Sequence, residues 1–161
     1  KLDGRYYKDA SYYSVVCNYT KGVVNGLYEY WDEKIYVRTN YIDNIENGER
    51  EIYDRTGKLL EYCNYIDGKR EGVREIFGDE YYIVENYVNG KLHGNKYEYD
   101  IYNNEEILRY SALYNNGVRE GMLIFYDKNG VPEITQIFKK GLKISEINKI
   151  KKVVTFYKYG K

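Results

Sequence analysis

The 161-residue chain is poor in several residue types on which common site chemistries depend. It contains one proline, one tryptophan, one methionine, one histidine and two cysteines. The single histidine, His93, has no second histidine and no Cys-x-x-Cys motif to join it in a metal site. No apolar stretch reaches the length of a membrane span, and no signal peptide is visible. We therefore predict no metal, no cofactor and no catalytic residues.

Tyrosine and glycine are abundant instead. The chain has 23 tyrosines, whereas phenylalanine, tryptophan and methionine together supply six residues, and 15 glycines stand against the one proline. A tyrosine-rich interior must keep its hydroxyl groups near water or a partner. This composition favours a thin, single-layered structure in which glycine makes the turns.

Charge is balanced overall, with 25 basic and 25 acidic residues, but it is unevenly distributed. Residues 139–161 hold eight lysines and one acidic residue, Glu146, which leaves residues 1–138 with 17 basic and 24 acidic residues. A globally basic nucleic-acid binder is therefore disfavoured, and we expect no nucleic-acid partner. We expect the lysine-rich end mainly to keep a terminal strand soluble, with contact to an anionic membrane surface as the alternative.

Internal repetition is the strongest signal in the chain. Residues 64–72 read N-Y-I-D-G-K-R-E-G, and residues 86–94 read N-Y-V-N-G-K-L-H-G. The second glycine of this motif recurs in steps of 22, 22, 24, 22 and 27 residues, a regularity that chance does not produce. The repeat glycines are Gly4, Gly22, Gly26, Gly48, Gly68, Gly72, Gly90, Gly94, Gly117, Gly121 and Gly141, while Asn44 and Ser145 replace two of them. Glycine adopts positive φ without the Cβ penalty, so these positions predict turns.

Two aromatic columns accompany the glycines. The first ends the strand before each turn and comprises Tyr19, Tyr41, Tyr65, Tyr87, Tyr114 and Phe138. The second follows the second glycine by five residues and comprises Trp31, Tyr53, Phe77, Tyr99 and Tyr126. We expect the sheet to bury Tyr65, Phe77, Tyr87 and Tyr99. Less constrained are Trp31 and three tyrosine pairs outside the pattern, Tyr6-Tyr7, Tyr12-Tyr13 and Tyr81-Tyr82. Such residues make good binding anchors because they offer a large area at little cost in side-chain entropy.

These spacings predict an all-β fold, an elongated antiparallel meander of tandem β-hairpin repeats that forms a single-layer, twisted or rolled solenoid sheet. We expect one repeat domain over residues 1–161, with hairpin units starting near residues 18, 40, 64, 86, 113 and 137 and partial units at 1–17 and 157–161. Both partial units match the middle of a turn, so we expect the chain to be an excerpt of a longer array. A free sheet edge also predicts a homodimer.

The Y-x-x-G-x-x-x-G unit with its trailing aromatic residue resembles the MORN repeat in its shorter bacterial variant, which also occurs in the group labelled YwqK-like antitoxins. The resemblance covers nearly the whole chain, from Lys1 to about Ser145. It implies a solenoidal sheet of hairpins with a binding or scaffolding role. Some eukaryotic relatives carry a phosphoinositide kinase domain beside such repeats. This chain has no G-x-G-x-x-G, H-R-D or D-F-G motif, so no kinase activity is carried over.

Three further groups of residues have structural interpretations. In the repeat register Cys17 and Cys63 lie four strand steps apart, about 19 Å, which excludes a disulfide within one molecule. His93 occupies a turn position and is expected to be solvated. Acidic residues recur three positions after the second glycine, and basic residues occupy the neighbouring column. We interpret both columns as one solvated face paired across strands, formed by Glu29, Glu51, Glu75, Arg50, Arg74 and Lys96.

Repetition without a unique polar constellation favours a binding module over an enzyme. The leading hypothesis is protein–protein interaction or scaffolding, with an antitoxin-like protein that masks another protein as one form of it. The alternatives are recognition of cell-surface glycans or choline by aromatic side chains, and attachment to anionic lipid through the lysine-rich end. The sequence leaves the partner open, and it leaves the compartment open between the bacterial cytoplasm and the cell envelope.

Overall fold

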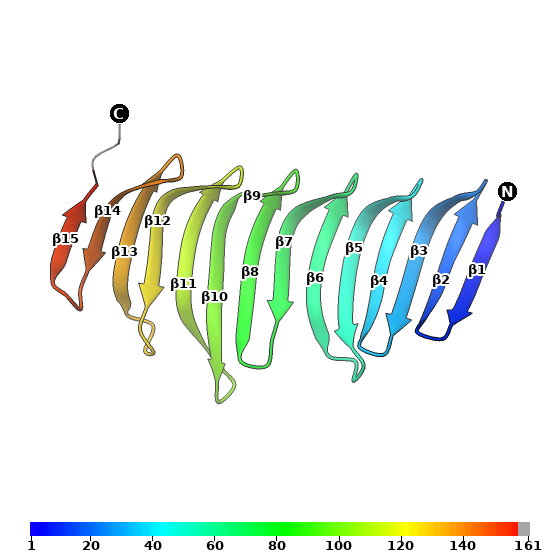
Figure 1. The fold of residues 1–161 in the computed structure, drawn as a ribbon, viewed down its shortest axis with the longest axis horizontal. Helices are drawn as coiled ribbons and strands as arrows, with labels where there is room; N and C mark the ends of the chain where they lie inside the picture. Colours follow the sequence, from blue (N-terminus) through cyan, green and yellow to red (C-terminus); the bar gives the residue numbers. More distant parts are fainter. Residues whose placement is uncertain (158–161) are drawn as a thin grey trace. The chain divides into compact units, whose positions relative to one another are not determined.

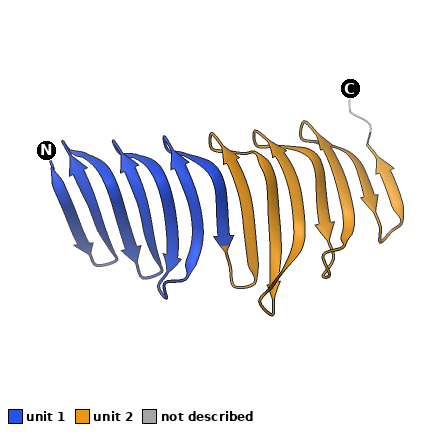
Figure 2. Cartoon of the chain, turned by 180° about the vertical axis from the view of Figure 1, so that it is seen from behind, with its two compact units in different colours: residues 1–76 blue, residues 77–161 orange. Residues whose placement is uncertain are grey.

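The structure is a computed structural model that describes residues 1–157, and every regular element in that range is a β-strand (Figure 1). That part of the chain therefore contains no helix long and apolar enough to cross a membrane. The chain divides into two compact units, Lys1–Ile76 and Phe77–Lys161 (Figure 2). The single repeat domain expected from the sequence stays a prediction. Except for Tyr157, the predicted partial unit at 157–161 lies outside the described residues.

The first unit is an antiparallel meander in which each strand pairs with the next strand along the chain. Its strands are β1 (Gly4–Ala10), β2 (Tyr13–Thr20), β3 (Val23–Asp32), β4 (Ile35–Ile42), β5 (Ile45–Asp54), β6 (Leu59–Ile66) and β7 (Lys69–Phe77), the last of which ends on the first residue of the second unit.

The second unit continues the same pattern. Its strands are β8 (Tyr81–Val88), β9 (Lys91–Leu92), β10 (Gly94–Tyr102), β11 (Glu105–Asn115), β12 (Val118–Tyr126), β13 (Pro132–Lys139), β14 (Leu142–Asn148) and β15 (Val153–Phe156). The short β9 pairs with β8, which also pairs with β10, and the later strands pair in chain order. The predicted all-β meander of hairpins is thus confirmed within each unit.

The first glycine of each repeat lies in a two-residue hairpin turn in which both residues have positive φ. Lys21 and Gly22 have φ angles of +52° and +88° between β2 and β3, and Asp67 and Gly68 have +49° and +73° between β6 and β7. Two successive positive φ angles define the type I′ turn, whose twist matches that of the flanking strands. Asn44 keeps the geometry at +67° where the repeat lacks its glycine, because asparagine tolerates this region.

The second glycine lies within a strand at Gly26, Gly48, Gly72 and Gly121, and it begins a strand at Gly4 and Gly94. At Gly26 it accompanies a bulge. Gly26 has a φ of +82°, and three residues of β3 face one residue of β2 at this point. Across the next pair of strands the same glycine lies opposite an aromatic residue of the first column: Gly26 opposite Tyr41, Gly48 opposite Tyr65, Gly94 opposite Tyr114 and Gly121 opposite Phe138. Each repeat therefore aligns its glycine with the aromatic residue of the following repeat.

Successive turns are joined by backbone hydrogen bonds. The second residue of a turn donates its N–H to a carbonyl oxygen of the preceding repeat: Gly22 to Leu2 at 2.8 Å, Asn44 to Val24 at 3.0 Å, Gly68 to Glu46 at 2.9 Å, Gly117 to Leu92 at 2.7 Å and Gly141 to Arg119 at 2.9 Å. A side chain often adds a second bond. Asn25 Oδ1 accepts the Asp43 N–H at 3.0 Å, and Glu120 Oε2 accepts the Lys140 N–H at 2.7 Å. His93 is exposed as predicted and accepts the Asn116 N–H on its Nδ1 at 3.5 Å.

The core of the first unit is one row of side chains on one face of the sheet, which we call the core face. Register places Cys17, Tyr28, Thr39, Arg50, Cys63 and Arg74 opposite one another in this order. Small and large side chains alternate along the row, and the small ones, Cys17, Thr39 and Cys63, are almost completely buried. Both cysteines are free, as predicted, since three strands separate β2 from β6. In the second unit Ala112, Leu123 and Phe138 form the equivalent cluster.

The turn glycine Gly68 provides a test of this architecture. A Cβ at this residue would have to tolerate a φ of +73° and would lie 3.3 Å from Ile45 Cγ2. We expect Gly68→Ala to lower the free energy of unfolding by about 1–2 kcal/mol, the cost of the left-handed conformation. Gly68→Asn is the matched control and should lose less than half as much. Urea unfolding followed by circular dichroism measures both, and an alanine variant as stable as the wild type would contradict the turn geometry.

Candidate binding surface

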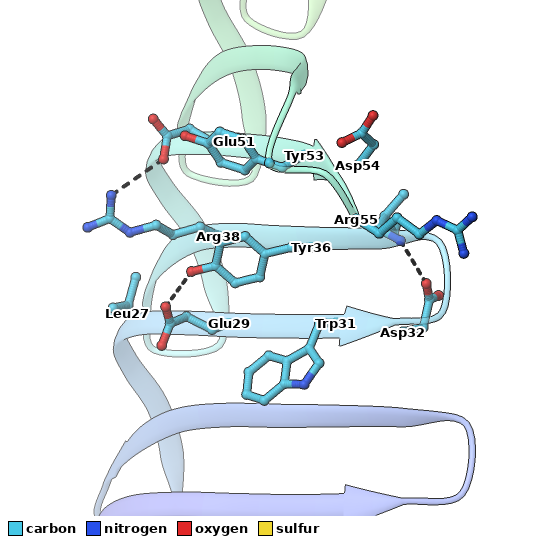
Figure 3. A pocket seen from close by; sticks show the side chains of 12 residues that line it. Leu27, Glu29, Trp31, Asp32, Tyr36, Arg38, Glu51, Tyr53, Asp54 and Arg55 are labelled. Carbon is cyan, nitrogen blue, oxygen red and sulfur yellow. Dashed lines mark hydrogen bonds and ion pairs between the residues drawn. The ribbon is translucent and has the colours of Figure 1, made fainter.

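The second aromatic column lies on the face opposite the core row, which we call the ladder face. In the first unit Trp31 on β3 lies opposite Tyr36 on β4, and Tyr36 lies opposite Tyr53 on β5. The ring centroids are 6.4 Å apart for Trp31 and Tyr36 and 5.8 Å apart for Tyr36 and Tyr53. All three rings are half-buried and form a continuous row across three strands (Figure 3).

Charged side chains border this aromatic row. Glu29 accepts a hydrogen bond from the Tyr36 hydroxyl, and Arg38 forms an ion pair with Glu51 at 3.4 Å (Figure 3). Burial, reinforced by the bond to Glu29, raises the pKa of Tyr36 to about 12, so its phenol stays neutral at physiological pH. With Leu27, Asp54 and other neighbours these residues line an open groove of about 780 Å³.

The turn between β3 and β4 fixes one end of the groove. Asp32 Oδ1 accepts the N–H groups of Lys34 at 2.8 Å and Ile35 at 2.9 Å, and Oδ2 accepts the Tyr30 hydroxyl at 2.9 Å. The bonds from the backbone of Ile35 and Lys34, followed by that from Tyr30, lower the pKa of Asp32. The Asp32 carboxylate is therefore ionised and held in one position next to Trp31.

A second, smaller hollow adjoins the other side of Trp31. Its volume is about 210 Å³, and Tyr12, Ser14, Asp32 and Glu33 are among the residues that line it. Ser14 on β2 lies directly opposite Trp31 and is buried. Because serine is small, the aromatic row ends at Trp31 and no further ring follows on β2.

The second unit contains a comparable aromatic row without tryptophan. Phe77, Tyr82 and Tyr99 stack with ring centroids 5.2 Å and 5.7 Å apart, and the Tyr126 hydroxyl lies 3.0 Å from the Ser111 hydroxyl. A separate groove of about 800 Å³ is lined by residues that include Glu80, Tyr102 and Arg109. Trp31 is the one tryptophan of the chain, so the aromatic row of the first unit includes a tryptophan and that of the second unit does not.

The two predicted aromatic columns therefore lie on opposite faces. The first column shares the core face: Tyr65 and Phe138 are buried, Tyr114 packs on the core cluster of the second unit, and Tyr19 and Tyr41 contact Tyr6 and Tyr28 edge to face. Tyr87 donates its hydroxyl to Glu85 at 2.9 Å on the same face. Phe77, Tyr87 and Tyr99, expected to be buried, are half-buried.

Our prediction that the acidic and basic columns share one face was wrong. Glu29 and Glu51 lie on the ladder face, where they interact with Tyr36 and Arg38. The basic column lies on the core face because adjacent residues of a strand point to opposite sides. Its ion pairs there include Arg50–Glu46 at 3.8 Å, Arg74–Glu61 at 2.7 Å and Lys96–Glu85 at 3.1 Å.

Two rings join neighbouring members of the second column, Tyr36 and Tyr82. Sequence reasoning missed Tyr36, and it named Tyr82 only as part of an unpatterned tyrosine pair. Each precedes an aromatic residue of the first column, Tyr41 or Tyr87, by five residues. This spacing was a usable signal. Among residues 1–157 no group of three or more histidine, cysteine, aspartate and glutamate side chains is placed to hold a metal ion.

No protein-family model and no curated protein matches the chain. Among solved structures it is similar to a mutant of S. aureus TarM in complex with fondaparinux, alpha-GlcNAc-glycerol and UDP, with a TM-score of 0.39 and 12% identity over 68% of this chain and 19% of that one. It is also similar to a second structure of TarM, with a TM-score of 0.21 and 16% identity over 96% of this chain and 21% of that one. The chain thus spans about a fifth of either structure. Neither likeness reaches a TM-score that shows a shared fold.

The Arg74–Glu61 pair predicts a pH dependence of stability. The two side chains are 18% and 15% exposed. Burial alone would raise the pKa of Glu61, but the hydrogen bond and charge of Arg74, followed by the charges of Arg70 and Arg50, hold it below its ordinary value of 4.5. A carboxyl with a lowered pKa in the folded state stabilises the fold above its unfolded pKa and loses that contribution as the pH falls.

We therefore expect Glu61→Gln to be less stable than the wild type at pH 7, with a difference that narrows as the pH falls below 4.5. Urea unfolding at several pH values between neutral and about 3 measures this difference in the free energy of unfolding. Glu105→Gln, at an exposed residue of the second unit, is the control and should follow the wild type throughout. A constant difference between Glu61→Gln and the wild type would contradict the interpretation.

Proposed function

We propose that this chain is a non-catalytic binding module, of the MORN-repeat type suggested by its sequence, that acts through protein–protein contacts on the ladder face. The observation that carries the proposal is the row of Trp31, Tyr36 and Tyr53 along an open groove. Tryptophan and tyrosine are enriched among residues that dominate the energy of protein interfaces. An antitoxin-like role, in which this surface masks another protein, is one form of such a function.

Repetition of equivalent environments favours binding over catalysis. A catalytic site needs one constellation of unlike groups, whereas here a glutamate at the Glu29 position recurs at Glu51 and Glu75, and a ring at the Trp31 position recurs at Tyr53. Such columns offer a partner the same contact several times, once on every second strand. Binding to a series of equivalent contacts is the usual function of repeat surfaces.

The rigidity of the scaffold also supports a binding role. Backbone hydrogen bonds between successive turns fix the strands that carry the three rings, and the rings contact one another in the absence of a partner. Because the three rings are already ordered, binding costs less side-chain entropy, and the affinity for a partner is higher.

Capture from an extract of the native host tests the proposal. We expect the immobilised chain to retain a defined protein that quantitative mass spectrometry detects, and we expect Trp31→Ala to reduce its recovery at least tenfold, as is typical of a dominant interface residue. Tyr81→Ala is the control, because Tyr81 is 48% exposed and lines neither groove. Absence of a retained protein, or equal retention by Trp31→Ala, would contradict the proposal.

A second candidate function rests on the end of the described chain. The turn between β14 and β15 contains Lys149, Lys151 and Lys152, and the apolar side chains of Ile150 and Phe156 nearby are 66% and 80% exposed. Basic and apolar side chains together suit the surface of an anionic membrane, where each lysine contributes about 1 kcal/mol.

Sedimentation with liposomes decides this candidate. Vesicles that contain phosphatidylserine should pull down the chain at low ionic strength and release it at high salt, because salt screens the lysines. Replacement of Lys149, Lys151 and Lys152 by glutamine should abolish the binding, whereas Lys34→Gln in the first unit should leave it unchanged. If the wild type fails to bind at low ionic strength, the membrane function is excluded.

A further inference from the structure

We propose that Trp31 is the anchor of a site that receives an arginine or lysine side chain from a protein partner. The proposal rests on the proposed function and specifies the chemistry of the partner. It follows from the position of the indole between two hollows and from the charge of the residues that line them.

The indole can be approached from two sides. On one side lies the groove that Trp31 shares with Tyr36, and on the other lies the smaller hollow above Ser14, with Tyr12 and Glu33 at its rim. Tyr12 is 79% exposed and Ser14 presents only a hydroxymethyl group, so neither side chain covers the ring. A flat or elongated cation therefore has room beside the indole.

The lining residues carry an excess of negative charge. Together the two hollows contain five carboxylates and two guanidinium groups: Glu29, Asp32, Glu33, Glu51 and Asp54 against Arg38 and Arg55. Arg38 is paired with Glu51 at 3.4 Å, and Asp32 is held ionised by its backbone bonds. The balance of three negative charges next to an aromatic ring favours a cation over a neutral sugar or an acidic ligand.

Cation–aromatic contact supplies the attraction. A guanidinium or ammonium over an indole gains about 0.5–2 kcal/mol from the ring quadrupole, and a carboxylate adds a charge-assisted hydrogen bond. The chain uses the same contact elsewhere. Lys8 Nζ lies 5.0 Å from the ring centroid of Tyr13, and the Arg70 guanidinium lies 5.9 Å from that of Tyr65. At Trp31 we expect the cation to come from the partner, and we expect arginine to be preferred because its planar group both stacks and binds carboxylates bidentately.

The single tryptophan gives the experiment its signal. Fluorescence excited beyond the absorption of tyrosine reports Trp31 alone in this chain. The probe is a short peptide with two arginines in a glycine background, titrated at low ionic strength. The matched peptide has glutamates in place of the arginines. We expect a saturable change with the arginine peptide that weakens as salt is added, and no change with the glutamate peptide. An equal response to both peptides, or to neither, would overturn the proposal.

Charge reversal then locates the site. Glu33→Lys, in the turn beside Trp31, should weaken binding of the arginine peptide at least fivefold, whereas Glu105→Lys, an equal charge change at an exposed residue of the second unit, should alter it less than twofold.

Choline chloride is the third probe. A choline affinity equal to or above that of the arginine peptide would assign the site to small quaternary ammonium ligands and overturn the proposal.

The two proposals fail in different ways. If an extract yields a protein partner whose retention depends on Trp31 but is unaffected by Glu33→Lys, the proposed function stands and the cationic anchor is wrong. If the arginine peptide binds at Trp31 and no protein of the host is retained, the site is real and the proposed function is wrong.

Discussion

The fold depends on the hydrogen bond that one turn donates to the turn before it. A type I′ turn leaves the N–H of its second residue directed away from its own hairpin, and in this chain that N–H reaches a carbonyl oxygen of the preceding repeat. Bonds such as Gly68 to Glu46 fix where each hairpin lies against its neighbour, and the aromatic residue of one repeat is thereby aligned with the glycine of another. The same alignment places the aromatic rings of the ladder face opposite one another on neighbouring strands.

A single sheet has no second layer to cover its side chains, and the core row shows how these units bury atoms nonetheless. Cys17, Thr39 and Cys63 are small, lie opposite the longer side chains of Tyr28, Arg50 and Arg74 on the neighbouring strands, and are almost completely buried. The arginines thus serve as packing groups as well as charges, since their aliphatic stems cover apolar surface. The ion pairs with Glu46 and Glu61 neutralise them there.

Local chemistry made most of the fold predictable from the sequence. Turns could be located because Gly22, Gly68 and their equivalents need positive φ, and hairpins follow from turns. The relation between the two aromatic columns could not be derived as easily. Between Tyr19 and Trp31 the chain passes through a turn and through the bulge at Gly26. A bulge adds residues to one strand of a pair, and this changes the face to which later side chains point. The alternation of apolar and polar residues in the sequence does not reveal such an addition. Tyr36 was missed because it belongs to the strand before the motif, where the repeat is weakest.

The hairpin, and not the strand, is the unit by which this architecture can lengthen. Duplication of one repeat adds two strands of opposite direction, so every later turn returns to the same edge of the sheet and each column gains one member. Insertion of a single strand would reverse the direction of all later strands and separate the turns that bond to one another. Selection on such genes can therefore change the length of the ladder face in whole repeats, without redesign of the contacts already present.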